Sequence, residues 1–391
     1  MAFAVSPIGV RLWCGAELLP RANLPLVLAS LVAVGLALTS WFALGRPVAA
    51  KANALAFSAL LLGPLVAEAG LRASFEVEGS PTRAPIRFAH NLVHDDYWVL
   101  AGRWNTSLDQ IAPERIHPRL GWCQNYPTEA NPIGLYETTL GQLQRDGRPK
   151  VLFYGDSYVA GHSRPENHIP AYMGARLPAS DVVDLGVGGY GTGQSYLLYE
   201  ETSGLVEKPL VLMSAMIYDL DRATLNVRTY QKPRLRLEEG GGLRVTNTPI
   251  HPNPRQFFQD APLSFRSFAL QAIQRRYLPL EDPLFAEKLE LNRAILVATA
   301  ERASEEDSEL LYVLFHTMYD LLEADVRSTF FVETLDELGI ECFDTREPLL
   351  AYIEETGVSP RKLYVTGHHN DLGNQIIGDA LLEELRRRGY R

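Results

Sequence analysis

From residue 150 onward, short apolar runs alternate with longer stretches in which apolar residues recur at helical spacing. This alternation is typical of βαβ units, in which helices connect parallel strands. The predicted strands are Lys150–Tyr154, Asp181–Leu185, Leu210–Ile217, Leu310–Phe315 and Ile340–Phe343. The predicted helices cover residues 169–177, 192–205, 284–304, 321–338 and 372–388. The pattern therefore predicts an α/β fold with a parallel sheet.

Two segments depart from this alternation. Residues 225–283 interrupt it, and within them residues 234–245 alternate between apolar and polar on both sides of Gly240–Gly242, which predicts a β-hairpin. Residues 73–148 contain many prolines and aromatic residues with little periodicity. The predicted organisation is an N-terminal anchor (1–72), an irregular lead-in (73–148) and one α/β domain (149–391) with an insertion (225–283).

The N-terminal part carries a long apolar run. Leu24–Leu44 has no charged residue, and its length matches the roughly 20 apolar residues that cross a bilayer as a helix. A second uncharged run, residues 52–67, is shorter and contains Pro64. We expect a membrane anchor of one or two helices, over about 24–44 and 50–68. A cleaved signal peptide and a buried helical hairpin remain alternatives.

The expected location is the cell inner membrane, with the later domain outside the cytoplasm. Basic residues occur on both sides of the first run, so the positive-inside rule does not give the orientation.

Composition narrows the range of partners. The chain has 391 residues, 46% of them hydrophobic, with 37 Lys and Arg against 47 Asp and Glu. The net charge of the whole chain is −10, but residues 1–72 carry +3, so the remaining residues carry −13. Nucleic-acid binding needs clustered Lys and Arg, so we expect no nucleic-acid partner. The three cysteines are too few for a zinc site or a disulfide framework, and either a Cys123–Cys342 bridge or unpaired thiols fit the pattern.

The first candidate motif is Gly155-Asp156-Ser157, directly after the first predicted strand. A serine at the carboxyl end of a strand lies at the sheet edge where ligands bind, and its hydroxyl group is a nucleophile if a base reaches it. Val159 stands where the G-x-S-x-G elbow has its second glycine. The alternative is that Asp156 and Ser157 only cap the next helix.

The second motif is a glycine-rich loop after the second strand. Gly186, Gly188 and Gly191 satisfy G-x-G-x-x-G, a dinucleotide-binding pattern. The loop does not follow the first strand, and no acidic residue ends a strand about 20 residues later, as that pattern requires. A loop of bare N–H groups could instead stabilise an oxyanion beside a serine, or simply form a turn.

The third motif is His368-His369-Asn370-Asp371, before the last predicted helix. A histidine at the sheet edge can act as a general base. The alternative is that His368 and His369 are simply solvent-exposed loop residues. Adjacent histidines rarely point at one ion and no further ligand is evident, so we expect neither a metal nor a cofactor.

The order and spacing of the three motifs resemble the SGNH (GDSL-type) hydrolase family. The resemblance covers about residues 150–388, and His117–Trp122 resembles the lead-in of membrane-anchored members. It implies a flavodoxin-like three-layer α/β/α sandwich, with Ser157 as the nucleophile, the N–H group of Gly189 at the oxyanion and His368 as the base. Asp156 matches the family's first sequence block, and Tyr218 stands at a position of its third block. The resemblance implies that both belong to the binding site.

Two positions differ from the family pattern. Tyr218 stands where the family has an asparagine that donates to the oxyanion, and a phenol can also donate. The acid that orients the histidine normally precedes it by two or three residues, but those positions are Thr366 and Val365. His368 is therefore expected to work in a dyad or to use another acid, with Asp344 and Asp371 as the candidates.

The function expected from the sequence is a membrane-anchored serine esterase or acyltransferase. Its substrate would be an ester of a glycan, a lipid or a small molecule. Two alternatives remain. The missing acid and the missing asparagine fit a non-catalytic binding module of the same fold, and the glycine pattern fits a nucleotide-binding α/β domain.

Overall fold

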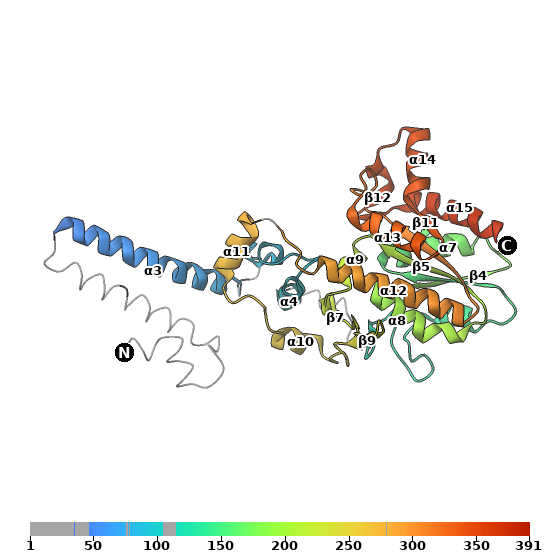
Figure 1. Cartoon of the computed structure of the whole chain (residues 1–391), viewed down its shortest axis with the longest axis horizontal. Coiled ribbons are helices and arrows are strands. Elements are labelled where there is room, and N and C mark those ends of the chain that lie inside the picture. Colours follow the sequence, from blue (N-terminus) through green and yellow to red (C-terminus); the bar gives the residue numbers. More distant parts are fainter. Residues whose placement is uncertain (1–34, 36–46, 76, 78, 105–114, 279) are drawn as a thin grey trace. The chain divides into compact units, whose positions relative to one another are not determined.

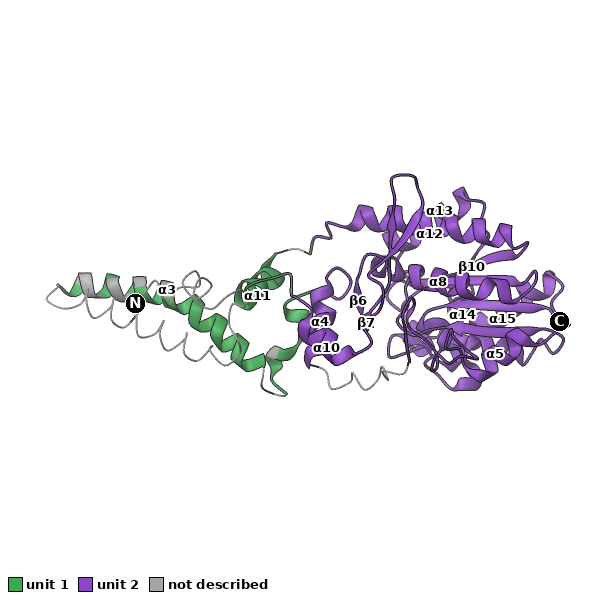
Figure 2. Ribbon diagram, turned by 90° about the horizontal axis from the view of Figure 1, so that it is seen from below, with its two compact units in different colours: residues 1–90, 263–280 green, residues 91–262, 281–391 purple. Residues whose placement is uncertain are grey.

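The structure is a computed structural model that describes residue 35 and residues 47–75, 77, 79–104, 115–278 and 280–391 (Figure 1). The chain divides into two compact units, of residues 1–90 with 263–280 and of residues 91–262 with 281–391 (Figure 2). Residues 263–280 lie in the predicted insertion but group with the N-terminal unit, because α11 (Phe268–Tyr277) packs on α3 (Val48–Phe75).

The larger unit is built on a five-stranded parallel sheet with the order β11-β10-β5-β3-β4. Its strands are β3 (Lys150–Gly155), β4 (Asp181–Gly186), β5 (Leu210–Met216), β10 (Glu309–Phe315) and β11 (Cys342–Asp344). Numbered along the chain and read from β4, this is the order 2-1-3-4-5 of flavodoxin-like doubly wound sheets. The predicted α/β fold with a parallel sheet is confirmed.

Helices cover both faces of this sheet. The connection from β3 to β4 runs in the opposite direction to the later connections, and right-handed crossovers therefore place the connecting helices on opposite faces. In agreement, α8 packs with α12, and α7 packs with α15. The helices are α7 (Ile169–Gly174), α8 (Thr192–Thr202), α12 (Phe285–Glu305), α13 (Val326–Glu337), α14 (Arg346–Thr356) and α15 (Asp371–Arg387).

The two central strands next to the site are buried along their whole length. Every residue of β3 and β5 is buried. A strand with helices on both faces has no solvent side, so its sequence is a continuous apolar run and not an alternating one. This explains why these strands could be predicted from the sequence.

Short elements surround the sheet. The hairpin predicted around Gly240–Gly242 is confirmed as β8 (Arg234–Leu237) paired with β9 (Leu243–Thr246). The others are α4 (Asp95–Trp104), β1 (Ile116–His117), β2 (Gly121–Trp122), α5 (Glu137–Gln144), α6 (Ser157–Ala160), α9 (Asp219–Arg222), β6 (Val227–Arg228), β7 (Tyr230–Gln231), α10 (Pro254–Asp260), β12 (Tyr364–Val365) and β13 (His368–His369).

The smaller unit contains α3 (Val48–Phe75) and α11 (Phe268–Tyr277). The carboxylate of Glu68 in α3 accepts hydrogen bonds from Ser267 Oγ at 2.9 Å and from the Ala269 N–H at 2.8 Å, so it caps the first turn of α11. The predicted helix over 50–68 lies within α3. The predicted span over 24–44 lies outside the described residues, and no described helix combines the length and hydropathy needed to cross a membrane.

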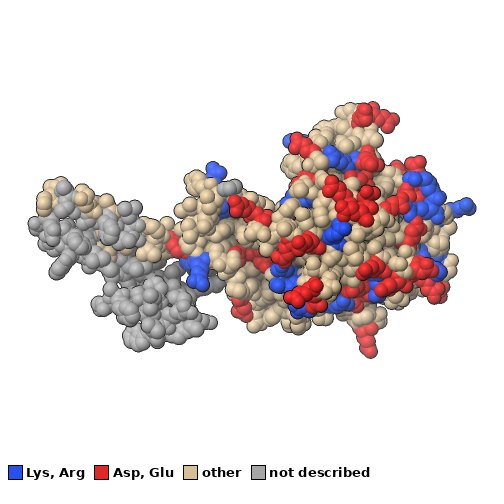
Figure 3. All heavy atoms as spheres, in the orientation of Figure 1, with Lys and Arg blue, Asp and Glu red and all other residues tan. Residues whose placement is uncertain are grey.

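The two described cysteines are not bonded to each other. Cys123 and Cys342 are free thiols, and burial raises the pKa of each to about 12. The disulfide alternative is therefore absent from the structure. On the visible face of the larger unit, acidic and basic side chains are interspersed, with no continuous basic stripe (Figure 3).

Candidate active site

Ser157 lies at the carboxyl end of β3, beside the point where the strand order reverses between β3 and β5. Ligands of doubly wound sheets bind at this reversal. Asp156 caps α6 by accepting the Tyr158 N–H at 2.8 Å, so the sharp turn presents Ser157 at the sheet edge. A side chain at Gly155 would collide with Ser214 Oγ, which explains the glycine before the turn. Asp156 therefore does form the helix cap that was one interpretation of the motif.

His368 meets this serine from the last hairpin. Its Nε2 atom lies 2.8 Å from Ser157 Oγ. Burial, and secondarily the nearby His162, lower the pKa of His368 below its usual value of 6.5. A neutral imidazole at this distance can accept the hydroxyl proton. The structure thus brings together two residues that are 211 positions apart in the sequence.

Among the described residues, no carboxylate stands behind His368. Its Nδ1 atom has no hydrogen-bond acceptor within the described chain, although the backbone of Thr366 is close enough to raise the pKa. Asp344 instead accepts a hydrogen bond from His316 Nε2 at 2.7 Å, and Asp371 accepts the Arg164 N–H at 3.1 Å. Both acids suggested by the sequence are therefore bound elsewhere, Asp344 because β11 lies at the far edge of the sheet from β3.

A second histidine, His162, stacks on one face of the His368 ring. The rings of His162 and His368 stack with centroids 3.8 Å apart and planes 20° from parallel. His162 follows α6 in an exposed loop, and nothing in the sequence distinguished it. His369, by contrast, is 2% exposed among the aromatic rings of Tyr158, Tyr364 and Phe315, and burial lowers its pKa to about 3.

The glycine loop lies close to Ser157. A Cβ atom placed on Gly188 would be 4.0 Å from Ser157 Cβ, and Trp122 Nε1 holds the loop by donating to the Gly188 carbonyl at 3.0 Å. The next residue, Gly189, has a φ of +84°, and its N–H group makes no hydrogen bond with any residue the structure describes. This N–H group is available to a ligand beside Ser157.

Close packing accounts for the other glycines of the pattern. A Cβ atom on Gly186 would lie 2.5 Å from the Ala160 nitrogen, and one on Gly191 would lie 2.8 Å from Arg222 Cβ. These contacts need glycine whether or not a pyrophosphate binds. The glycine pattern is therefore weak support for a nucleotide-binding site.

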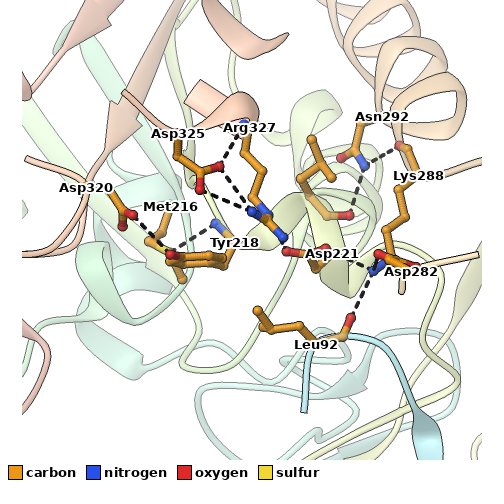
Figure 4. Close-up of polar contacts among 11 residues, drawn as sticks. Leu92, Met216, Tyr218, Asp221, Asp282, Lys288, Asn292, Asp320, Asp325 and Arg327 are labelled. Carbon is orange, nitrogen blue, oxygen red and sulfur yellow. Dashed lines mark hydrogen bonds and ion pairs between the residues drawn. The ribbon is translucent and has the colours of Figure 1, made fainter. Parts of the chain in front are cut away.

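Tyr218 does not present its hydroxyl group to the serine. The hydroxyl donates to Asp320 Oδ1 at 3.0 Å, and the close-up shows the ring turned toward that carboxylate (Figure 4). The expected replacement for the asparagine donor is therefore engaged in another contact. Asp320 lies in the loop after β10.

A buried ion-pair network lies beneath the site. Arg222 Nη1 donates to Asp156 Oδ2 at 3.0 Å and also pairs with Asp219. All three side chains are nearly inaccessible to solvent. Arg222 thereby connects α9 to the cap that positions Ser157. The sequence did not single out Arg222, because its partner Asp156 is distant in the chain.

Solved structures resemble this chain in fold. A G-D-S-L-family lipolytic protein from Veillonella parvula matches with 12% identity over 61% of this chain and 98% of its own, with a TM-score of 0.35. An acetylxylan esterase from Geobacillus stearothermophilus, in a variant of its catalytic serine, matches with 16% identity over 62% and 96%, with a TM-score of 0.37. A putative G-D-S-L lipolytic protein from Desulfitobacterium hafniense matches with 15% identity over 60% and 99%, with a TM-score of 0.34.

No protein-family model and no curated protein sequence matches the chain. At these identities the structural matches describe a likeness in fold only. The chemistry of the site therefore rests on the contacts described above.

Proposed function

We propose that the chain is a serine esterase or acyltransferase of the SGNH type. The observation that carries this proposal is the 2.8 Å contact between Ser157 Oγ and His368 Nε2 at the reversal of the strand order. A serine paired with a neutral imidazole at a ligand-binding edge is the arrangement that acyl transfer requires.

The reaction follows from the positions of these groups. Ser157 Oγ attacks the ester carbonyl while His368 Nε2 accepts its proton, and the N–H groups of Ser157 and Gly189 bind the negatively charged oxygen. His368 then gives the proton to the departing alcohol, which leaves an acyl group on Ser157. Water, or a second alcohol in a transferase, attacks that acyl group and regenerates the serine.

The absence of an acid behind His368 lowers the expected rate. In a triad this acid fixes the tautomer and the orientation of the imidazole. Here the His162 stack and the Thr366 backbone are the contacts that orient the ring. The same observation favours the second candidate function, a binding module of this fold that has lost turnover.

Labelling with a fluorophosphonate probe separates the two candidates. We expect the folded chain to become labelled, Ser157→Ala to lose the label and His368→Ala to label much more slowly. Ser163→Ala, in the nearby loop, is the matched control and should label like the wild type. Folded chain that stays unlabelled would favour the binding module, and equal labelling of Ser157→Ala would exclude Ser157 as the nucleophile.

We also propose attachment to the cell inner membrane through residues 24–44, with the larger unit outside the cytoplasm. The support is the uncharged run Leu24–Leu44, of about the length that a bilayer-spanning helix needs. A glycan or lipid ester near the membrane would then be accessible to the site.

A further inference from the structure

A cavity of about 490 Å³ lies at the same sheet edge as Ser157. This volume is within the range of small-molecule sites. Its walls come from three segments, one after β5, one after β10 and one that leads into His368. The lining residues are Tyr218, Thr317, Met318, Tyr319, Arg361, Tyr364, Val365, Thr366 and Gly367.

The cavity lies on the histidine side of the reaction centre. Thr366 and Gly367 directly precede His368, and the Gly367 carbonyl accepts the Tyr158 hydroxyl at 2.8 Å, which ties this wall to the helix that carries Ser157. His368 gives its proton to the departing alcohol, so the alcohol oxygen must lie near His368. The oxyanion lies toward Gly189, which is not part of the cavity wall. The cavity is therefore placed to hold the alcohol half of an ester.

The wall combines aromatic rings with one unpaired cation. Tyr319 is 78% exposed. Arg361 alone is charged among the lining residues, and it makes no hydrogen bond or ion pair with any residue in the described ranges. Asp320 lies behind the wall, but its two oxygens accept hydrogen bonds from Tyr218 and Thr317. The charge of Arg361 thus has no partner from the chain in the cavity.

Building on the proposed function, we propose that this cavity selects esters whose alcohol half carries an anionic group, bound by Arg361. A guanidinium group donates two parallel hydrogen bonds to a carboxylate or a phosphate. Tyr218, Tyr319 and Tyr364 also line the cavity. The anion is the shared chemistry, and a uronic acid and a sugar phosphate are two sources of it.

Kinetics with matched esters tests the selection. We would compare methyl glucuronoside, methyl glucoside 6-phosphate and methyl glucoside, each carrying one acetyl group at the same ring position. We expect kcat/KM to be highest for one or both anionic esters. Arg361→Gln should lower this preference about tenfold, the size expected for one charged hydrogen-bonded contact. Arg361→Lys should restore part of it, because a lysine keeps the charge but not the paired geometry.

Lys362→Gln is the matched control. It removes the same charge one residue away, and Lys362 does not line the cavity, so the preference should stay unchanged. An equal preference in Arg361→Gln and the wild type, or a preference for the neutral ester, would overturn the proposal. Comparing the two anionic esters shows whether a carboxylate or a phosphate is the better ligand.

A binding measurement separates this proposal from the proposed reaction. Unacetylated methyl glucuronoside and methyl glucoside 6-phosphate can be titrated against Ser157→Ala and followed by ligand-observed NMR. We expect binding of the better anion that Arg361→Gln weakens. If no ester is hydrolysed but this binding is observed, the proposed reaction is rejected and the anion site is supported. If esters are hydrolysed but neither anion binds, the anion site fails and the reaction stands.

Discussion

At the scale of single residues, the ring of His162 stacks on one face of the His368 ring and so restricts its orientation. Stacked aromatic pairs contribute about 0.5–1.5 kcal/mol beyond their buried area. We expect His162→Ala to lower kcat by roughly two- to tenfold, because the imidazole then samples orientations away from Ser157. His162→Phe keeps a stacked ring and should retain most of kcat. Steady-state kinetics on a chromogenic acetyl ester measures both, and equal losses in the two variants would contradict an orienting role.

The same pair sets the pH dependence. The proposed base acts in its neutral form, and burial and His162 both lower the pKa of His368. Activity should therefore rise with pH through a midpoint below 6.5. Asp156 raises this pKa and Arg222 lowers it, and both stay in place in His162→Phe. That variant removes the electrostatic effect by which His162 lowers the pKa of His368, so its midpoint should move to higher pH. A kcat/KM profile with no shift, or a shift to lower pH, would contradict this.

Part of the site could be predicted from single positions. Ser157, Gly189 and His368 follow strand ends or precede the last helix, so their motifs indicate one sheet edge. The lack of an orienting acid among the described residues could not be predicted, because Asp344 also follows a strand end and only the strand order places that strand at the far edge. His162 and Arg222 act through contacts that depend on tertiary structure, and no residue pattern marks them.

At the scale of elements, the four-residue helix α9 joins the site to α12. On one side Arg222 pairs with Asp156. On the other side Asp221 pairs with Lys288 at 2.9 Å and with Arg327 at 2.6 Å (Figure 4). Lys288 is fully buried. Lys288 also pairs with Asp282 at 2.7 Å, so its removal leaves Asp282 without this counter-charge and leaves Asp221 with Arg327 alone.

We therefore expect Lys288→Met to lower the free energy of unfolding by about 3 kcal/mol. Arg293→Met on the same helix is the control, because Arg293 and its partner Glu337 are 47% and 59% exposed, and exposed pairs contribute only about 0–1 kcal/mol. Urea denaturation followed by circular dichroism measures both. Similar losses in the two variants would show that the buried pair adds no particular stability.

The elements differ in how far they could be predicted. The strands β3, β5 and β10 match their predicted ranges within about one residue, because burial on both faces leaves continuous apolar runs. Helix α14 was missed. Only Leu349 is buried in it, so its sequence has almost no apolar stripe, and Pro348 lies in its first turn.

At the scale of the whole molecule, the smaller unit has features suited to a membrane surface. Helix α11 exposes Leu270, Ile273 and Tyr277 at helical spacing and carries Arg275 and Arg276 in its last turn. Amphipathic helices with basic residues bind at the headgroup region of anionic bilayers. It belongs to the unit that also contains the uncharged run over 24–44. These features support the proposed membrane attachment.

We expect the full chain to sediment with membranes and to remain there after an alkaline carbonate wash. Val32→Arg combined with Leu36→Arg should release it, because each arginine at the centre of a spanning helix costs about 2.5–3.5 kcal/mol on insertion. Leu205→Arg combined with Leu237→Arg is the control, since both leucines are exposed in the larger unit. If the first pair stays in the membrane as firmly as the control, residues 24–44 do not hold the chain there. If the unaltered chain washes off, it is bound at the surface and does not span the bilayer.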